Sequence, residues 1–451
     1  MSEKLDLHAV NPSREELQQY SNLDSAIVDY NYFEDDAQKR ADAKQEFKSG
    51  QSYLPDYNYP RLNHIYDDFM TGDMNPMTHE KKYENLLDMK SQIYKSVQEL
   101  EVASQKGDIN APEYQLYADY QERFYKQILL IESAERLRKN NDDVNRREFT
   151  KANERLYGPF HPEYFQAILD GSNAEIFNPE ILDKLGAVVK DRFSAELSVV
   201  PDTDNTVYYE KDQVADFMNQ ALAKSGLADQ GWQAEINPNK TIVAVNGQEK
   251  KVYLPGNIRR NANELRRLMV HEIGTHAWRA RNGEASGQKA LQFGTADYAD
   301  VEEGLGVIME CAVAGNFNNA SLERAEERYI VAGFALGADG KNPRDARDTF
   351  EISWPIIAER LAKGGEITDK IKETARDRAY NHIENAFRGT DMYMQGMIYA
   401  KLKIYYEGLV DNIKYFQDHT DDLEGALDRA MIGKYNHTST DEYRTVQQLL
   451  S

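Results

Sequence analysis

The sequence predicts an α+β protein in which helices predominate. Apolar residues recur every three to four positions over most of the 451-residue chain, as they do on the buried face of a helix. Short strand-like stretches are confined to residues 207–254. Because 41% of the residues are apolar, the chain can bury a substantial core and is not expected to be disordered.

Changes of pattern along the chain divide it into three regions. Residues 1–77 are rich in Tyr and Asn, show weak periodicity and are expected to form an N-terminal arm. Residues 78–155 have a strong helical pattern with a break at Gly107–Asn110, which predicts a helical hairpin. Residues 156–450 hold the motifs that carry chemistry and are expected to form the catalytic domain.

A small antiparallel sheet is predicted in the third region. A helix at Asp212–Ser225 precedes the candidate strands, and the turn dipeptide Asn246-Gly247 separates the last two of them. The three candidate strands are Trp232–Ile236, Thr241–Val245 and Lys250–Leu254. The last is expected at an edge of the sheet, where it could pair with an extended peptide. Beyond Pro255, helices are expected to about Leu450.

Charge and cysteine content exclude several classes of protein. The formal net charge of −22 argues against nucleic-acid binding, which needs a basic surface to displace counterions. Cys311 is the only cysteine, so any metal must be bound by histidines and carboxylates. The start has no signal-peptide core and no run of 18 apolar residues occurs, so we expect no membrane association and a cytoplasmic location.

The hexapeptide His271-Glu272-Ile273-Gly274-Thr275-His276 is the most informative motif. Its predicted helix begins with Asn261 as N-cap and stops at Asn282-Gly283. Two imidazoles one helical turn apart can bind one Zn²⁺ ion. A glutamate next to the first histidine can then accept a proton from a water activated by the metal.

The histidine spacing requires a distorted helix. The common motif has its histidines four residues apart, whereas His271 and His276 are five apart. Five residues of a regular α-helix turn about 500°, which would leave the two side chains about 140° apart. A π-type bulge absorbs one extra residue and would return them to one face. We therefore predict a widened turn at Ile273–Thr275, where Gly274 eases the distortion.

A third ligand is expected from an apolar helix around residues 300–310. A buried carboxylate in such a helix should be paired, protonated or bound to a metal, because an isolated buried charge is costly. Glu302 and Glu303 would point about 100° apart on a helix, so only one of them can face the metal. Spacing does not choose between them, and both could also be solvated residues at a helix start.

These motifs resemble the tyrosine/phenylalanine carboxypeptidase domain family, which includes microtubule-associated tyrosine carboxypeptidases and bacterial proteins with a Gln-Glu-Gly-Leu-Ala motif. The resemblance rests on the hexapeptide and on Glu303-Gly304-Leu305, and it covers about residues 150–415. Further matching positions are Arg279, Asn282, Gly283, Phe293-Gly294-Thr295, Phe387-Arg388-Gly389, Lys401 and Tyr405-Tyr406-Glu407-Gly408. Glu302 and Gly306 stand where the bacterial motif has Gln and Ala.

The resemblance implies a zincin-like metallopeptidase core that binds one Zn²⁺ ion per chain. It implies His271, His276 and Glu303 as the ligands and Glu272 as the general base. The expected substrate is the C-terminal tail of a peptide or protein, from which a Tyr or Phe residue is released. Two alternatives stay open. One is a zinc endopeptidase or amidase with the same site, and the other is a non-enzymatic interaction protein with a structural metal.

A carboxypeptidase also needs a cation for the terminal carboxylate of its substrate. Arg279, Arg388 and Lys401 are candidates, although each could instead form a surface or supporting ion pair. Tyr405 could line a pocket for an aromatic side chain or belong to the core. A basic cluster at Arg259, Arg260, Arg266 and Arg267 could attract an acidic tail, but a solvated helix face is the favoured interpretation.

Overall fold

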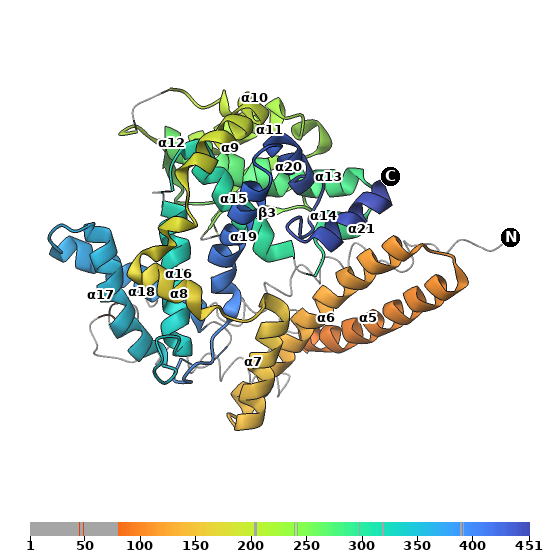
Figure 1. Cartoon of the computed structure of the whole chain (residues 1–451), viewed down its shortest axis with the longest axis horizontal. Coiled ribbons are helices and arrows are strands. Elements are labelled where there is room, and N and C mark those ends of the chain that lie inside the picture. The colour runs from red at the N-terminus through yellow and green to blue at the C-terminus, as the bar shows by residue number, and fades with distance from the viewer. Residues whose placement is uncertain are drawn as a thin grey trace. The chain divides into compact units, whose positions relative to one another are not determined.

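The computed structural model describes residues 80–451, together with Gln45 and Lys48, apart from residues 203, 204, 239, 241, 297, 318, 319, 388, 389 and 391. The predicted arm of residues 1–77 therefore lies outside the described residues except at those two positions. The described chain confirms the predominantly helical α+β class (Figure 1). Its helices include none that is long and apolar enough to cross a bilayer.

The chain forms two compact units, each built from separate stretches of sequence. The first unit comprises the chain up to Ile109 with Gln121–Ser172 and Ala325–Lys403. The second comprises Asn110–Tyr120, Asn173–Arg324 and Ile404–Ser451, and it contains the whole hexapeptide. The predicted division of the chain at residues 77 and 155 stays a prediction.

The first unit is helical throughout its described part. Its elements are α5 (Glu80–Lys106), most of α6 (Ala111–Lys139), α7 (Asp143–Tyr157), α8 (Pro162–Asp170), most of α16 (Ala320–Leu336), α17 (Ala346–Ala362), α18 (Asp369–Ala386) and η4 (Ala400–Lys403). Helices α17 and α18 pack around a core that includes Phe350, Ile357, Tyr380 and Ile383.

Helices α5 and α6 run side by side as the predicted hairpin, and the break at Gly107–Asn110 falls between them (Figure 1). Lys90 Nζ on α5 lies 2.8 Å from Glu132 Oε2 on α6. Asn110 and Glu113 cap the start of α6 reciprocally through their side chains, at 2.8 and 2.9 Å. The helical pattern of this region therefore predicted these two helices, whereas the separate helix α7 that follows them was not predicted.

The second unit combines helices with two small sheets. Its strands are β1 (Tyr208–Glu210), β2 (Gln233–Asn237), β3 (Ala244–Asn246), β4 (Lys251–Pro255) and β5 (Arg259–Asn261). Its helices before the hexapeptide are η1 (Ser172–Glu175), α9 (Pro179–Arg192), α10 (Ser194–Leu197), α11 (Lys211–Lys224), η2 (Ala228–Gln230) and α12 (Ala262–Leu268). Those that follow are η3 (Met269–Ala277), α13 (Trp278–Ala285), α14 (Lys289–Phe293), α15 (Tyr298–Ala314), α19 (Ile404–Asp418), α20 (Leu423–Ala430) and α21 (Thr440–Leu450).

The prediction of a purely antiparallel sheet was wrong. The three-stranded sheet has the order β2-β4-β3, with β2 parallel and β3 antiparallel to β4. Strand β4 is the most buried of the three, and its apolar residues place it at the centre. Because β4 has a neighbour on each side, its backbone has no free edge for a peptide, contrary to our expectation.

A second, two-stranded sheet was not predicted. Strands β1 and β5 pair antiparallel, with Tyr209 opposite Arg260. Each strand has three residues, which is too short for alternation to stand out in the sequence. Strand β5 leads directly into α12, so this pairing fixes where the hexapeptide helix begins.

The core of the second unit joins the three-stranded sheet to the hexapeptide helix. Val252 and Leu254 of β4 pack with Val214 and Met218 of α11 and with Ile273 of η3. All five side chains are fully enclosed. The apolar face of the helix is therefore held against the sheet, and its polar face turns toward α15.

Candidate metal centre

The hexapeptide lies on a π-helix, η3, which is continuous with α12 before it and α13 after it. The predicted widened turn at Ile273–Thr275 is thus confirmed and extends over Met269–Ala277. The N–H group of Trp278 bonds to Ile273 O, five residues back. In this i→i+5 geometry, residues five apart lie on one face of the helix.

Sequence also predicted how this helix begins, but not how it ends. Asn261 Oδ1 accepts from Glu264 N, and Glu264 Oε2 accepts from Asn261 N, both at 3.0 Å, as a capping box. The helix passes the expected stop at Asn282-Gly283 and continues to Ala285. Gly283 serves close packing instead, because a Cβ there would lie 2.1 Å from Leu291 O.

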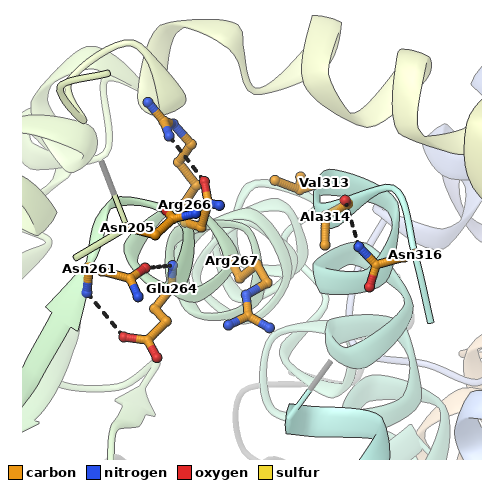
Figure 2. Close-up of a pocket in the computed structure, with 9 residues that line it drawn as sticks. Asn205, Asn261, Glu264, Arg266, Arg267, Val313, Ala314 and Asn316 are labelled. Carbon is orange, nitrogen blue, oxygen red and sulfur yellow. Dashed lines mark hydrogen bonds between the residues drawn. The ribbon is translucent and has the colours of Figure 1, made fainter. Parts of the chain in front are cut away.

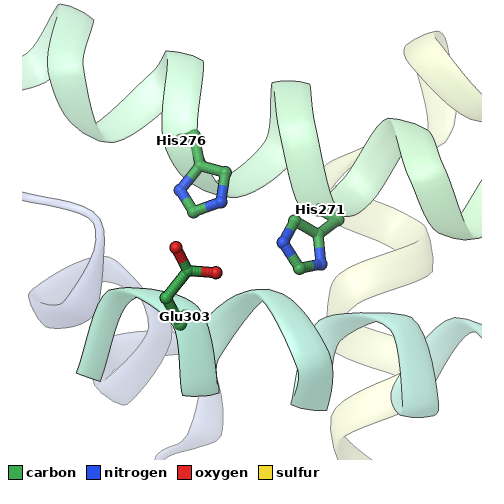
Figure 3. Close-up of side chains that lie close together, drawn as sticks. All are labelled: His271, His276 and Glu303. Atoms are coloured by element: carbon green, nitrogen blue, oxygen red, sulfur yellow. The ribbon is translucent and has the colours of Figure 1, made fainter. Parts of the chain in front are cut away.

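The structure brings together the three residues that the resemblance implied as ligands. One ligand atom from each of His271, His276 and Glu303 lies within 4.8 Å of the others. Figure 3 shows the two imidazoles on η3 above the carboxylate of Glu303 on α15. Two imidazoles and one carboxylate are the donor set that suits Zn²⁺ and leaves a coordination position open.

Each histidine is held from behind by a carboxylate. His271 Nδ1 lies 2.7 Å from Glu310 Oε1, and His276 Nδ1 lies 2.8 Å from Glu302 Oε1. An ionised carboxylate only accepts hydrogen bonds, so each Nδ1 is the donor and Nε2 is left as the ligand atom. Histidines that bind metals in proteins are commonly oriented in this way. The arrangement therefore fits a bound cation.

Glu302 is the centre of a buried ion-pair network. Arg279 Nη1 lies 2.5 Å from Glu302 Oε2, and Lys434 Nζ lies 3.3 Å from Glu302 Oε1. Burial raises the pKa of Glu302, but Lys434, Arg279 and His276 outweigh burial and hold that pKa far below its usual range. Glu302 thus stays ionised and supports His276, which leaves Glu303 to face the imidazoles.

Arg279 takes the supporting role that the sequence left open as an alternative. Its side chain is completely buried, and besides Glu302 it donates to Gly433 O at 2.8 Å and Tyr435 O at 2.6 Å. All of these partners are protein groups, so the guanidinium has no free side for a substrate carboxylate. We therefore do not retain Arg279 as a substrate-binding residue.

Glu310 and Lys434 were missed by the sequence analysis. Glu310 is seven residues after Glu303, which places both on one face of α15, and its Oε2 accepts from Ser321 Oγ at 2.6 Å. That periodicity could have revealed Glu310. Lys434 lies more than a hundred residues along the chain, in a segment with no motif, and no local signal connects it with the site.

Negative charge surrounds the two histidines. Burial lowers the pKa of His271, but the hydrogen bond to Glu310 and the nearby carboxylates raise it to about 10. Burial also raises the pKa of Glu272, an effect that the two histidines only partly offset. Three glutamates next to two imidazoles form an electrostatic environment that a divalent cation would neutralise.

Glycines set the distance between α15 and its neighbours. A Cβ at Gly306 would lie 2.7 Å from Cε1 and 2.8 Å from Nε2 of His271. A Cβ at Gly304 would lie 2.0 Å from the carbonyl carbon of Gly408 on α19. Both are closer than any real contact, so the glycine at 306 makes room for the imidazole and that at 304 lets the two helices touch.

Three further predicted site residues lie on other parts of the chain. Arg388 lies outside the described residues. Lys401 is on η4 in the first unit, whereas the metal centre is in the second. Tyr405 is on α19 in the second unit and is partly buried. Their roles toward substrate stay predictions.

Fold and site together describe a helical α+β protein with a histidine- and carboxylate-based centre on a widened helix. A family model, microtubule-associated tyrosine carboxypeptidase, matches residues 45–340. The chain belongs to this family, whose activity is that of a carboxypeptidase. The match includes the hexapeptide and all of α15, and it ends before Lys401 and Tyr405. No curated protein and no solved structure matches the chain significantly.

Proposed function

We propose that this protein is a zinc-dependent carboxypeptidase that releases an aromatic residue from the C-terminus of a peptide or protein. His271, His276 and Glu303 would hold one Zn²⁺ ion per chain in a zincin-like core, and Glu272 would be the general base. The observation that carries the proposal is the set of three donor atoms within 4.8 Å, with both histidines held by carboxylates. A cytoplasmic location also stays a prediction.

The bound ion would supply Lewis acidity, which polarises the scissile carbonyl and makes a water acidic enough to be deprotonated. Glu272 follows His271 directly and is buried, and burial raises its pKa. A carboxylate with a raised pKa is a better base than a solvated one. Glu272 would accept the proton of the attacking water and pass it to the leaving amine.

The first test is the metal content of the purified protein by elemental analysis, next to the His271→Ala variant. We expect about one zinc per chain in the wild type and none in the variant. Peptides that end in Tyr or Phe should then lose that residue, as followed by mass spectrometry. The Glu272→Gln variant should retain zinc and lose activity. Failure to bind zinc after zinc has been supplied would contradict the proposal.

Two alternative functions are separated by the same peptides. An endopeptidase or amidase with this site should cleave a peptide whose C-terminal carboxylate is blocked as an amide, whereas a carboxypeptidase should not. A structural metal predicts zinc without hydrolysis of any peptide. The buried Glu272 beside the proposed ligands favours catalysis over a structural site, which would need no base.

A further inference from the structure

A polar pocket lies beside the hexapeptide helix, at the end nearest α12, in the second unit (Figure 2). Its volume is about 330 Å³. The side chains of Asn205, Asn263 and Asn316 bring amide groups to its wall, and Val313, near the end of α15, also lines it. Two arginines of α12, Arg266 and Arg267, also line it. Glu264 lines the pocket too, and one oxygen of its carboxylate is occupied by the N–H group of Asn261. The pocket therefore combines hydrogen-bond donors with two positive charges and one negative charge.

The arginines of this region differ in their hydrogen-bond and ion-pair partners. Arg259 Nε lies 3.0 Å from Glu210 Oε1. Arg266 donates to Val200 O at 3.2 Å and pairs with Asp202 at 3.6 Å. Arg267 is partly buried and has no hydrogen bond or ion pair within the described part of the chain, although its charge helps to lower the pKa of Glu310. Figure 2 shows its guanidinium beside α15 without a bond to any other residue drawn.

An arginine has five N–H donors, and those of Arg267 meet no acceptor among the described residues, so its guanidinium can donate to a ligand that brings one. A carboxylate matches the planar fork of an arginine and accepts two parallel hydrogen bonds from it. Asparagine amides nearby can donate to the same oxygens. The pocket therefore has the chemistry of a carboxylate site.

The position of Arg267 connects this pocket to the metal centre. Helix α15 runs antiparallel to the hexapeptide helix, since His276 meets Glu302, His271 meets Glu310, and Arg267 shares the pocket with Val313. Arg267 precedes His271 by four residues, which is one helical turn or about 5.4 Å along the axis. An extended peptide advances about 3.3 Å per residue, so this offset corresponds to one or two residues of substrate.

We propose that Arg267 binds a carboxylate of the peptide substrate in this pocket. The inference rests on the proposed function, because it assigns one part of that substrate. The carboxylate is that of the C-terminal residue or that of an acidic side chain within two residues of the scissile bond. Arg267 thereby supplies the cation that Arg279 cannot supply.

The test measures peptide binding to the zinc-loaded Glu272→Gln protein by fluorescence anisotropy, so that no turnover is needed. Three labelled hexapeptides ending in tyrosine serve as probes. The first has glutamates at the two positions before the tyrosine, the second is the same peptide with a C-terminal amide, and the third has glutamines in place of the glutamates. The affinity for each peptide is measured for the Glu272→Gln protein and for the double variant that also carries Arg267→Gln. Arg260→Gln serves as the matched control, because Arg260 belongs to the same basic cluster but does not line the pocket.

Arg267→Gln should weaken binding of the first peptide about tenfold, which equals 1.4 kcal/mol. The affinity for the peptide that lacks the bound carboxylate should not change in this variant. If that peptide is the amidated one, Arg267 binds the terminal carboxylate. If it is the glutamine peptide, Arg267 binds an acidic side chain. Arg260→Gln should change all three by less than about twofold. An equal loss for all three peptides in Arg267→Gln, no loss, or no binding of any peptide would overturn the inference.

The same experiment separates this inference from the proposed function. If the selective loss is found but the protein with intact Glu272 hydrolyses no peptide, the carboxylate site stands and the carboxypeptidase proposal fails. If hydrolysis is found without the selective loss, the enzyme stands and Arg267 has no part in substrate binding.

Discussion

Glu310 Oε1 lies 2.7 Å from Nδ1 of His271 and orients its imidazole ring. No residue was predicted from the sequence for this supporting role. Replacing Glu310 with Gln removes the charge and keeps the shape of the side chain. We expect the affinity for zinc to fall about 10- to 100-fold, as measured by competition with a chelator. Glu424→Gln, on the exposed face of α20, is the matched control and should have no effect. Equal zinc affinities for Glu310→Gln and wild type would show that His271 needs no support.

Removing Arg279 should destabilise the second unit. Arg279→Met leaves the buried Glu302 with a weaker partner in Lys434 and deprives two backbone carbonyls of their donor. Breaking a buried ion pair from one side costs about 3–5 kcal/mol in free energy of unfolding, which urea denaturation can measure. Arg281→Met, which removes a partly exposed arginine two residues later, should cost less than about 1 kcal/mol. Similar losses in the two variants would contradict the network.

Gly306→Ala tests whether the space beside His271 is needed. The new methyl group would overlap the imidazole, whose position is fixed by Glu310, so the ring has to move. We expect weaker zinc binding with a melting temperature of the metal-free protein close to that of wild type. Gly304→Ala should instead lower the melting temperature of the metal-free protein, because its methyl group meets the backbone of α19 and separates two helices. Unchanged zinc affinity in Gly306→Ala would mean that the ring adjusts freely.

Acid should destabilise the first unit in two steps. Burial lowers the pKa of His382, and it stays lowered although Glu327 opposes this effect. His382 therefore takes up a proton near pH 6.5 in the unfolded chain but stays neutral in the folded chain. The free energy of unfolding consequently falls as the pH drops below about 6.5. Burial raises the pKa of Glu327, but His382 and Arg378 outweigh it and lower that pKa. The stability from ionised Glu327 is present above about pH 4.3 and is lost below it.

The His382→Gln variant isolates the first of these steps. Its free energy of unfolding, from urea titrations between pH 7.5 and 5, should depend less on pH than that of wild type. The pH dependence below the ordinary glutamate pKa should remain, because Glu327 keeps Arg378 as a partner at 2.8 Å. An identical slope in both proteins would exclude His382 as the group responsible.

The parts of the structure that follow from local sequence were predictable. The capping box at Asn261 and Glu264, the hairpin of α5 and α6, and the widened turn between His271 and His276 each depend on residues close together in the chain. The choice of Glu303 over Glu302 did not follow from spacing. The structure separates the two because Arg279 and Lys434 hold Glu302, and Lys434 is distant in sequence.

Pairings between distant segments were not predictable in the same way. The parallel contact of β2 with β4 depends on β4 taking the buried centre of the sheet, which alternation within a strand does not reveal. Arg279 illustrates the same limit within the site. Its position one turn after His276 fitted both a substrate contact and a buried pair. Only its complete burial beside Glu302 distinguishes them.

The π-helix also bears on how such centres are recognised. It absorbs a residue between His271 and His276, so the two rings occupy the places on the helix surface that a four-residue spacing would give them on an ordinary α-helix. The capping box before the π-helix and Arg279 after it point in the same directions about the helix axis as they would on an α-helix without the extra residue. A search for histidines four residues apart would therefore pass over a surface that is equivalent in three dimensions. Helix phase, and not residue count, defines this class of motif.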